Sequence, residues 1–255
     1  PASAPASGPG PGQPETVAPA WQALPMLQVD RRRAARNHLV SLVGGDGAAE
    51  IDGIRTRLLQ HLAAKGFRKV AITSPTPGAG KTTLALNLGF SLGRQSDQRT
   101  IVADADLRRP QMAKMLGIPA RHCFDRVLDG TAPFADNALR VGDHLAFATT
   151  HGPVRNSAEL LQSRRARTAL DAIQCAYDPT VMLFELPPVL ASDDAMAFLG
   201  HMDCALIVAA AERNSTKEVD RCERDVASQT TVLGVVLNRC RYMDPADGYA
   251  DYYSG

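Results

Sequence analysis

Short apolar runs alternate with amphipathic segments along most of the sequence, and this alternation restricts the fold more than any other feature. Two of the runs, KVAIT at residues 69–73 and ALIVAAA at 205–211, have the length and composition of buried strands. The segments between the runs carry apolar residues at helical spacing, as in IDGIRTRLLQHL at 51–62. Buried strands that alternate with helices predict an α/β fold of three layers, in which helices cover both faces of a mostly parallel sheet.

The same patterns predict where the other elements lie. We expect strands at residues 99–106, 144–150, 180–186, 204–211 and 231–238, and helices at 82–93, 156–177, 193–200 and 216–228. Within the long helix at 156–177, Asn156 and Glu159 have the spacing of a capping box. No internal repeat is visible, so we expect one α/β domain over residues 38–240.

Both ends of the chain differ from this domain in composition. Residues 1–29 contain seven prolines and six alanines, with Glu15 as their only charge. Such a segment buries too little surface to offset its ordering entropy, so we expect residues 1–37 to be a disordered tail followed by a basic linker. The linker, DRRRAAR at 30–36, is a solvated segment or a weak anchor to anionic lipid. We expect residues 241–255, which contain a tyrosine cluster, to be a flexible tail.

The composition argues against several kinds of function. Basic and acidic residues nearly cancel, 28 against 27, and aromatic residues make up only 5% of the chain, so nothing indicates a nucleic-acid-binding protein. The five cysteines are scattered without a CxxC pair, which favours reduced thiols over a disulfide framework or a zinc site. No apolar run approaches the roughly 18 residues that a membrane span needs. We therefore expect a cytoplasmic protein that lies at the inner membrane only through a partner.

The segment SPTPGAGKTT at residues 74–83 lies between a predicted strand and a predicted helix. It matches the phosphate-binding pattern GxxxxGK[ST] at Gly80, Lys81 and Thr82, while Pro75 replaces the first glycine. Glycines at this place let backbone N–H groups close around phosphate oxygens, and the helix that follows points its positive end at the bound anion. A chance glycine-rich turn would not explain this order of elements. We expect the nucleotide to be bound by Thr76, Pro77, Gly78, Ala79, Gly80, Lys81, Thr82 and Thr83.

Acidic residues follow two of the other predicted strands. Asp104 and Asp106 come at the end of one strand with a spacing of two, and Glu185 follows the apolar run VMLF. Carboxylates beside a phosphate site repel one another unless a cation or a proton lies between them. This arrangement therefore indicates Mg²⁺ coordination or proton abstraction; the alternative is a pair of aspartates that cap a turn before Pro110. The acid after VMLF has the place of a Walker B carboxylate, which is usually the shorter aspartate.

Together these motifs resemble the bacterial tyrosine autokinases of capsule and exopolysaccharide export, a branch of the P-loop NTPases. The resemblance extends over SPTPGAGKTT, VADADLRRP, GPVRNSAELLQS, ELPPVL, LGVVLNR and the terminal YADYYSG, from about His38 to the end. In that family a proline commonly stands before the loop glycines. Partition and septum-positioning ATPases are the nearest alternative, but they carry an extra lysine at the position of Thr76.

The resemblance implies a role for each site residue. Lys81 and the loop would hold ATP, and Thr82 with Asp104 would bind Mg²⁺, supported by Glu185. The catalytic residues would be Lys81, Asp104 and Asp106, with Asp106 accepting the proton of a tyrosine hydroxyl. Asn238 is similar to the adenine contact of the family. Arg108 and Arg109 would stabilise charge or contact another subunit, unless they are only solvated. The phosphoacceptors would be Tyr242, Tyr249, Tyr252 and Tyr253.

The function implied is an ATP-dependent protein-tyrosine autokinase that regulates exopolysaccharide or capsule polymerisation and export. Its partners would be further copies of the chain and a membrane-embedded chain-length regulator that activates it in trans. Three positions depart from the family: Glu185 replaces the usual aspartate, and in the oligomerisation helix Asp52 and Ala49 replace an arginine and a glutamate that precede Arg55. These departures leave open a nucleotide-gated scaffold with weakened catalysis, and a partition-type ATPase is a further alternative.

Overall fold

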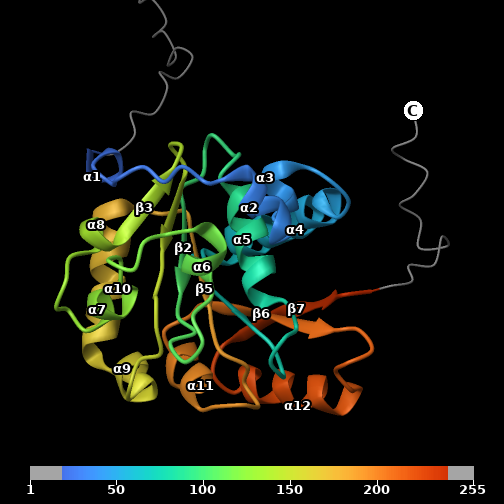
Figure 1. Ribbon diagram of the computed structural model, residues 1–255. Coiled ribbons are helices and arrows are strands. Elements are labelled where there is room, and N and C mark those ends of the chain that lie inside the picture. The colour runs from blue at the N-terminus through green and yellow to red at the C-terminus, as the bar shows by residue number, and fades with distance from the viewer. Residues whose placement is uncertain (1–18, 241–255) are drawn as a thin grey trace, which may run out of the picture.

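The computed structural model describes residues 19–240 and shows, over this range, a seven-stranded sheet with helices on both faces (Figure 1). The strand order is β3-β4-β2-β5-β1-β6-β7, and all neighbouring strands are parallel except β3 and β4. The predicted α/β fold with a mostly parallel sheet is thus confirmed. The strands are β1 (Lys69–Thr73), β2 (Thr100–Asp104), β3 (Ala138–Val141), β4 (Leu145–Ala148), β5 (Val181–Glu185), β6 (Cys204–Ala210) and β7 (Thr231–Asn238).

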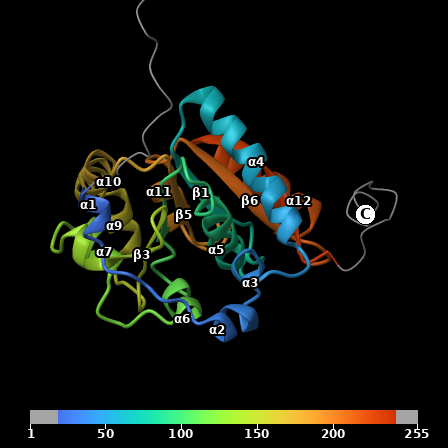
Figure 2. The same ribbon diagram turned by 90° about the horizontal axis from the view of Figure 1, so that it is seen from above.

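Each face of the sheet buries an apolar core beneath its helices (Figure 2). Successive strand residues point to opposite faces, so Val70 and Ile72 enter one core while Ala71 enters the other. The core around Val70 is covered by α2 (Arg31–Arg36), α3 (Val40–Val43), α4 (Ala48–Lys65), α5 (Lys81–Leu92) and α6 (Met112–Leu116). The other core is covered by α1 (Pro19–Gln22), α7 (Phe124–Leu128), α8 (Phe134–Asn137), α9 (Ser157–Gln162), α10 (Arg164–Tyr177), α11 (Asp194–Leu199) and α12 (Thr216–Ala227).

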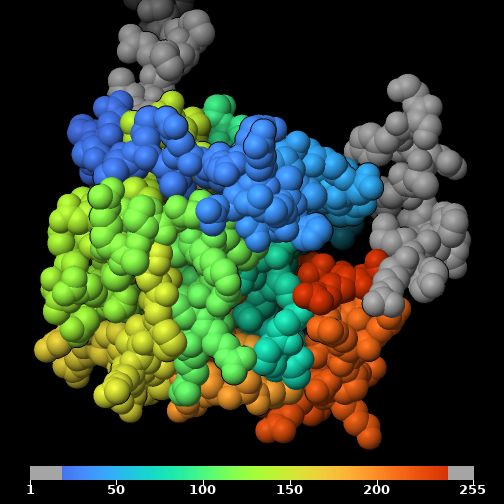
Figure 3. All heavy atoms as spheres, in the orientation of Figure 1, coloured from blue at the N-terminus to red at the C-terminus, as the bar shows by residue number. Residues whose placement is uncertain are grey.

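The sequence places a tail and a linker at residues 19–37, whereas the structure shows this segment lying along the domain surface (blue in Figure 3). Trp21 is fully buried and Leu24 is 2% exposed, both in the core that α10 covers. The backbone of Leu27 donates to the carbonyl of Arg140 at 2.7 Å, which joins the segment to β3. The expectation of disorder is therefore wrong for this part of the tail; residues 1–18 lie outside the described range.

The basic stretch 30–36 is also part of the domain. It forms α2, whose N-terminus is capped by the Asp30 carboxylate, and Ala34 is fully buried. The side-chain amide of Asn37 donates to the carbonyl of Met115 at 3.1 Å and so fixes the end of α2 against α6. A helix with a capped start, a buried face and a tied end is not the solvated linker that the charge pattern indicates.

Three further features of the structure differ from the expectations. The helix expected at 156–177 consists of α9 and α10, separated at Ser163, whose hydroxyl accepts the N–H of Ala166 and so caps α10. Asn156 has φ +54° and makes no side-chain cap, so the predicted capping box is wrong. Residues 138–141, for which no strand was expected, form β3, which pairs with β4 in antiparallel orientation.

We expect Trp21→Ala to destabilise the domain by about 3 kcal/mol, because it removes a large, fully buried side chain from the core. Met26→Ala is the matched control, since Met26 lies in the same segment and is 60% exposed. Urea denaturation followed by circular dichroism measures both variants. Equal stability of the two variants would show that residues 19–29 contribute nothing to folding.

Candidate functional site

The glycine-rich loop joins β1 to α5 at the carboxyl end of the sheet, near its centre. Gly78 and Gly80 have φ values of +83° and +97°, which only glycine adopts without strain. A Cβ on Gly80 would lie 2.2 Å from the Asn238 amide nitrogen, so the Asn238 side chain would have to leave its place against the loop. The backbone N–H groups that begin α5 face the mouth of the loop, as an anion site requires.

Two asparagines fix the loop from the neighbouring strands. The Asn238 amide, at the end of β7, donates to the carbonyl of Ala79 at 2.8 Å. The Asn214 amide, after β6, donates to the Thr76 hydroxyl at 2.6 Å. Asn214 has no part in the sequence prediction, because its role depends on the neighbouring position of two strands. The side-chain oxygen of Asn238 accepts the backbone N–H of Arg239. Both ends of the side-chain amide are thus used to hold the loop and the residue after β7, and the adenine contact of Asn238 stays a prediction.

A cavity of about 730 Å³ opens in front of the loop, a volume suited to a nucleotide. The predicted site residues that line it are Pro77, Gly78, Gly80, Lys81, Thr82, Thr83, Asp106 and Glu185. Four other predicted residues are not part of this lining, namely Thr76, Ala79, Asp104 and Asn238. The cavity is also lined by residues that the sequence did not indicate, among them Asn37, Gln111, Lys114 and Arg239.

Two carboxylates lie side by side beneath the cavity. Asp104 and Glu185 are register partners at the ends of β2 and β5, and they are 0% and 2% exposed. Burial, and then the charge of Glu185, raises the pKa of Asp104 well above its usual value. Burial raises the pKa of Glu185 to about 7, although Lys81 and the Thr82 hydroxyl lower it. The pair therefore needs a cation or protons to be stable.

Cations and donors surround this pair. The Thr82 hydroxyl donates to one Glu185 oxygen, and the Lys81 ammonium lies 3.9 Å from the Asp106 carboxylate. Asp104 accepts the backbone N–H groups of Asp106 and Met112, each at 3.2 Å. Every polar group predicted for the phosphate and metal site is thus gathered around the loop.

These residues fit the needs of Mg²⁺. One oxygen of Glu185 is buried and, within the described range, has no hydrogen-bond partner. In residues 19–240, no group of three or more His, Cys, Asp and Glu side chains is placed to hold a metal by itself. Mg²⁺ is usually held by one or two carboxylates together with phosphate oxygens and water, so Thr82, Asp104 and Glu185 suit it when a nucleotide is bound.

The two arginines after β2 have different surroundings. Arg108 contacts the buried carboxylate of Asp194 at 2.8 Å and the exposed carboxylate of Asp193 at 3.6 Å. Asp194 in turn accepts the hydroxyl of Ser157, so Arg108 ties β2 to α9 and α11. Arg109 lines the cavity and has no ion pair among the residues described. Arg109 is therefore the arginine with a charge available to the site.

The helix predicted to mediate oligomerisation, α4, makes an internal ion-pair cluster. Asp52 contacts the guanidinium groups of Arg55 and Arg94 and accepts the hydroxyl of Ser91. Arg94 and Ser91 belong to α5 and the turn after it, so the cluster joins α4 to the body of the domain. Asp52, which departs from the family pattern, thus makes its ion pairs within one chain.

The tyrosines predicted as phosphoacceptors, Tyr242, Tyr249, Tyr252 and Tyr253, lie outside the described residues. None of the helices within residues 19–240 combines the length and the apolarity that a bilayer crossing requires.

Comparison with known proteins agrees with this geometry. The family described as "ParA: NUBPL iron-transfer P-loop NTPase" matches residues 67–253. The tyrosine-protein kinase Etk of Escherichia coli is 29% identical over 196 residues, which are 76% of this chain and 27% of Etk. The tyrosine-protein kinase YwqD of Bacillus subtilis is 26% identical over 187 residues, 72% of this chain and 78% of YwqD. These matches confirm the resemblance to bacterial tyrosine kinases.

Solved structures extend the agreement to three dimensions. The crystal structure of the VpsO kinase domain has a TM-score of 0.69 and 26% identity, and the alignment covers 82% of this chain and 98% of that domain. The chain spans 26% to 30% of the length of most curated relatives that it matches. The solved kinase domain of the Escherichia coli tyrosine kinase ETK is also similar, with a TM-score of 0.62 and 26% identity.

We expect Gly80→Ala to weaken ATP binding at least about tenfold, because a Cβ would strain a left-handed residue and collide with Asn238. Gly130→Ala is the matched control: Gly130 has φ +74°, but a Cβ there meets no atom within 4 Å. Isothermal titration calorimetry with Mg·ATP compares the two variants. Unchanged affinity in Gly80→Ala would contradict the placement of the phosphates at this loop.

Without metal and nucleotide, we expect the protein to become less stable as pH rises. The raised pKa of Glu185, about 7 against 4.5, means that the folded state keeps a proton that the unfolded state has already released between these values. The free energy of unfolding should therefore fall by about 3 kcal/mol across this window. Urea denaturation at several pH values in EDTA measures the slope.

Glu185→Gln should reduce this slope, because the amide does not titrate and still accepts the Thr82 hydroxyl, while Asp104, whose pKa is also raised by burial, keeps the remainder. Glu223→Gln, at an exposed position on α12, serves as control and should keep the slope of the original chain. A slope in Glu185→Gln as steep as that of the original chain would show that Glu185 does not contribute to it.

Proposed function

Because this chain belongs to the ParA family of P-loop NTPases and is similar to bacterial tyrosine-protein kinases, we propose that it is an ATP-dependent protein-tyrosine kinase. Its acceptors are the tyrosines of the C-terminal segment of another copy. The observation that carries the proposal is the meeting of Lys81, Thr82, Asp106 and Glu185 in one cavity at the loop.

The residues of the cavity have separate tasks in this reaction. The loop backbone and Lys81 hold the β- and γ-phosphates of ATP, and Thr82 and Asp104, with Glu185, hold Mg²⁺. When bound, Mg²⁺ neutralises charge on the phosphate oxygens. Lys81 contacts Asp106 at 3.9 Å and is within reach of both the carboxylate and a phosphate beside it.

Asp106 accepts the proton of the tyrosine hydroxyl as the phenolic oxygen forms a bond to the γ-phosphorus. The bond from that phosphorus to the bridging oxygen breaks, and ADP leaves with the bonding electrons. Asp106 is 6% exposed, so little water competes for the attacking position. Phosphoryl transfer needs mainly positioning and charge neutralisation, and this small set of groups provides both.

The relatives support a role in exopolysaccharide or capsule assembly, since one of them carries a name that places it in a cps region. The phosphorylation cycle would tune polymerisation and export, with a membrane-embedded chain-length regulator as the activating partner. Phosphate charge on adjacent tyrosines would disfavour the docking of tails into neighbouring active sites. A position at the inner membrane through that partner belongs to the same proposal.

A second candidate, a nucleotide-gated scaffold with weak catalysis, is favoured by two contacts. Glu185 already takes the Thr82 hydroxyl, which is a ligand expected for Mg²⁺. Asp52 is engaged inside the chain and is not free to contact another copy. A partition-type ATPase agrees with the family match, but the place of its extra lysine is occupied by Thr76, whose hydroxyl binds Asn214.

Autophosphorylation with labelled ATP tests the proposal. We expect phosphotyrosine on the C-terminal segment of the original chain and a loss of at least about 100-fold in Lys81→Met, because the lysine charge on the phosphates is removed. Mass spectrometry of protein co-expressed with its membrane partner locates the modified tyrosines. ATP hydrolysis without tail labelling would support the partition-type ATPase instead.

Glu185→Asp separates the kinase from the attenuated scaffold. A large gain in phosphorylation would indicate that the longer acid weakens catalysis, whereas an unchanged rate would show that Glu185 already serves. Binding of Mg·ATP in both proteins, measured by calorimetry, is the control that the site remains intact.

A further inference from the structure

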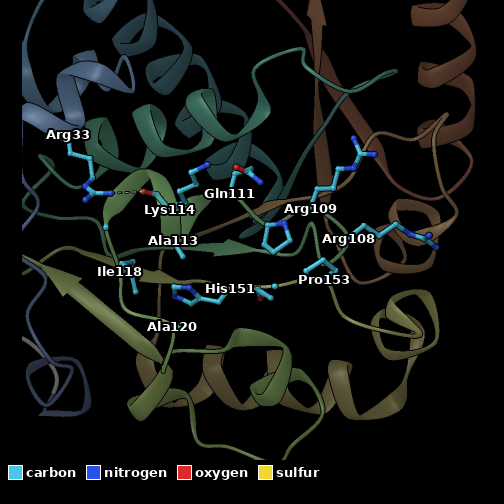
Figure 4. A pocket seen from close by; sticks show the side chains of 14 residues that line it. Arg33, Arg108, Arg109, Gln111, Ala113, Lys114, Ile118, Ala120, His151 and Pro153 are labelled. Carbon is cyan, nitrogen blue, oxygen red and sulfur yellow. Dashed lines mark hydrogen bonds between the residues drawn. The ribbon is translucent and has the colours of Figure 1, made fainter.

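A groove of about 680 Å³ lies beside the nucleotide cavity and is lined by basic side chains (Figure 4). We call it the basic groove. Arg33 of α2 and Lys114 of α6 lie toward one end, and Arg108 and Arg109 lie at the other, with His151 on the opposite side. No Asp or Glu is among its lining residues. Because the whole chain has a formal charge of only +1, this concentration of positive charge is local.

Three of these charges lack a carboxylate partner among the residues that the structure describes. The Arg33 guanidinium donates to the backbone carbonyl of Lys114 at 3.1 Å and makes no ion pair there. Lys114 and Arg109 likewise make none within residues 19–240. Arg108 is neutralised by Asp193 and Asp194, so its charge is already compensated. The groove therefore offers an acidic ligand three positive charges that nothing else in this range neutralises.

The rest of the lining is largely apolar. It is provided by Pro110, Ala113, Ile118, Ala120 and Pro153. His151 adds an imidazole whose pKa is lowered by burial and by the neighbouring His122, so it contributes little charge at neutral pH. A groove with apolar walls between separated cations suits a peptide that alternates aromatic rings and carboxylates.

The basic groove continues into the nucleotide cavity. Arg109, Gln111 and Lys114 line both, and Asp106 lines the cavity just beyond them. A peptide that lies in the groove can therefore extend toward the proposed proton acceptor. This continuity connects the groove to the reaction.

We propose that the basic groove docks the acidic tyrosine segment of a second copy of this chain, residues 242–253, and so presents its tyrosines for phosphorylation. The segment YMDPADGYADYY carries aspartates at 244, 247 and 251 between four tyrosines, and it contains no Lys or Arg. Its three negative charges match the three free positive charges of the groove. The inference rests on the proposed kinase function and assigns that function a substrate-docking surface.

The topology favours a second copy over the segment's own domain. The chain leaves β7, which is separated from β2 by β6, β1 and β5 in the sheet. At about 4.8 Å between strands, the end of β7 is roughly 19 Å from the end of β2. The phosphate-binding loop after β1 lies between them. A segment from another copy can enter the groove from outside without passing over this loop.

A two-copy phosphorylation assay tests the proposal. One copy, the enzyme, has its four C-terminal tyrosines replaced by Phe; the other, the substrate, carries Lys81→Met and keeps its tyrosines. Arg33→Glu placed in the enzyme copy, at a residue that lines the groove but not the nucleotide cavity, should raise KM for the substrate copy about tenfold and leave kcat within about twofold. The same change in the substrate copy should have no effect. An effect only in the substrate copy, or an unchanged KM, would overturn the docking surface.

Arg32→Glu in the enzyme copy is the matched control, because Arg32 is exposed on α2, does not line the groove and changes the charge equally. Arg33→Gln is a second test of the groove that removes charge without reversing it, and it should raise KM about threefold. Thermal unfolding by circular dichroism confirms that each variant is folded.

Direct binding separates the groove from the kinase activity. A fluorescent peptide of residues 242–253 should bind the Lys81→Met chain without nucleotide, and salt should weaken this binding. Replacing its three Asp residues by Asn should weaken binding at least about fivefold, and Arg33→Glu in the protein should weaken binding of the original peptide by a similar factor. If the peptide binds but no phosphate is transferred to tyrosine in the two-copy assay, the kinase function is refuted and the docking surface stands. If phosphate is transferred but peptide binding depends neither on the Asp residues of the peptide nor on the basic residues of the groove, the docking surface is refuted and the kinase function stands.

Discussion

Two carboxylates buried side by side at the centre of the sheet determine how this site is built. The strand order places β2 next to β5, and their register puts Asp104 opposite Glu185. Neither side chain reaches bulk water, so their mutual repulsion cannot be screened by solvent. Lys81 and the Thr82 hydroxyl offset part of it, and the remainder is offset only by protons or by a metal ion. A site that is electrostatically incomplete without a ligand is a site adapted to bind one.

The position of these groups at the ends of parallel strands also explains which parts of the site could be predicted from the sequence. The loop, Asp104, Asp106 and Glu185 each follow an apolar strand, and the carboxyl ends of parallel strands meet at one edge of the sheet. Local pattern and fold class therefore suffice to bring them together. Asn214 and Lys114 carry no such local sign, since their contacts with the loop and the cavity depend on which strands and helices become neighbours.

The errors in the fold have equally physical causes. The average composition of residues 1–29 is that of a disordered segment, yet burial of Trp21 and Leu24 is enough to fix its last third against the domain. The break between α9 and α10 comes from Ser163, whose extended backbone and capping hydroxyl start a new helix inside an uninterrupted helical pattern. In both places a few side chains decide the local structure against the average composition or helical pattern of the surrounding residues. The fold class follows from averages and is robust to such exceptions.

Asp52 and the basic groove show two opposite uses of charge. Asp52 is neutralised by Arg55 and Arg94 of its own chain, so it stabilises the contact of α4 with α5 and leaves little charge for a partner. Apolar residues separate the cations of the groove, and none of the residues that line it is acidic. The charge of these cations therefore stays available to a ligand. Since unneutralised like charges destabilise a folded chain, their persistence beside the nucleotide cavity is best explained by a ligand that completes them. The acidic segment at the end of this same sequence has the composition of such a ligand.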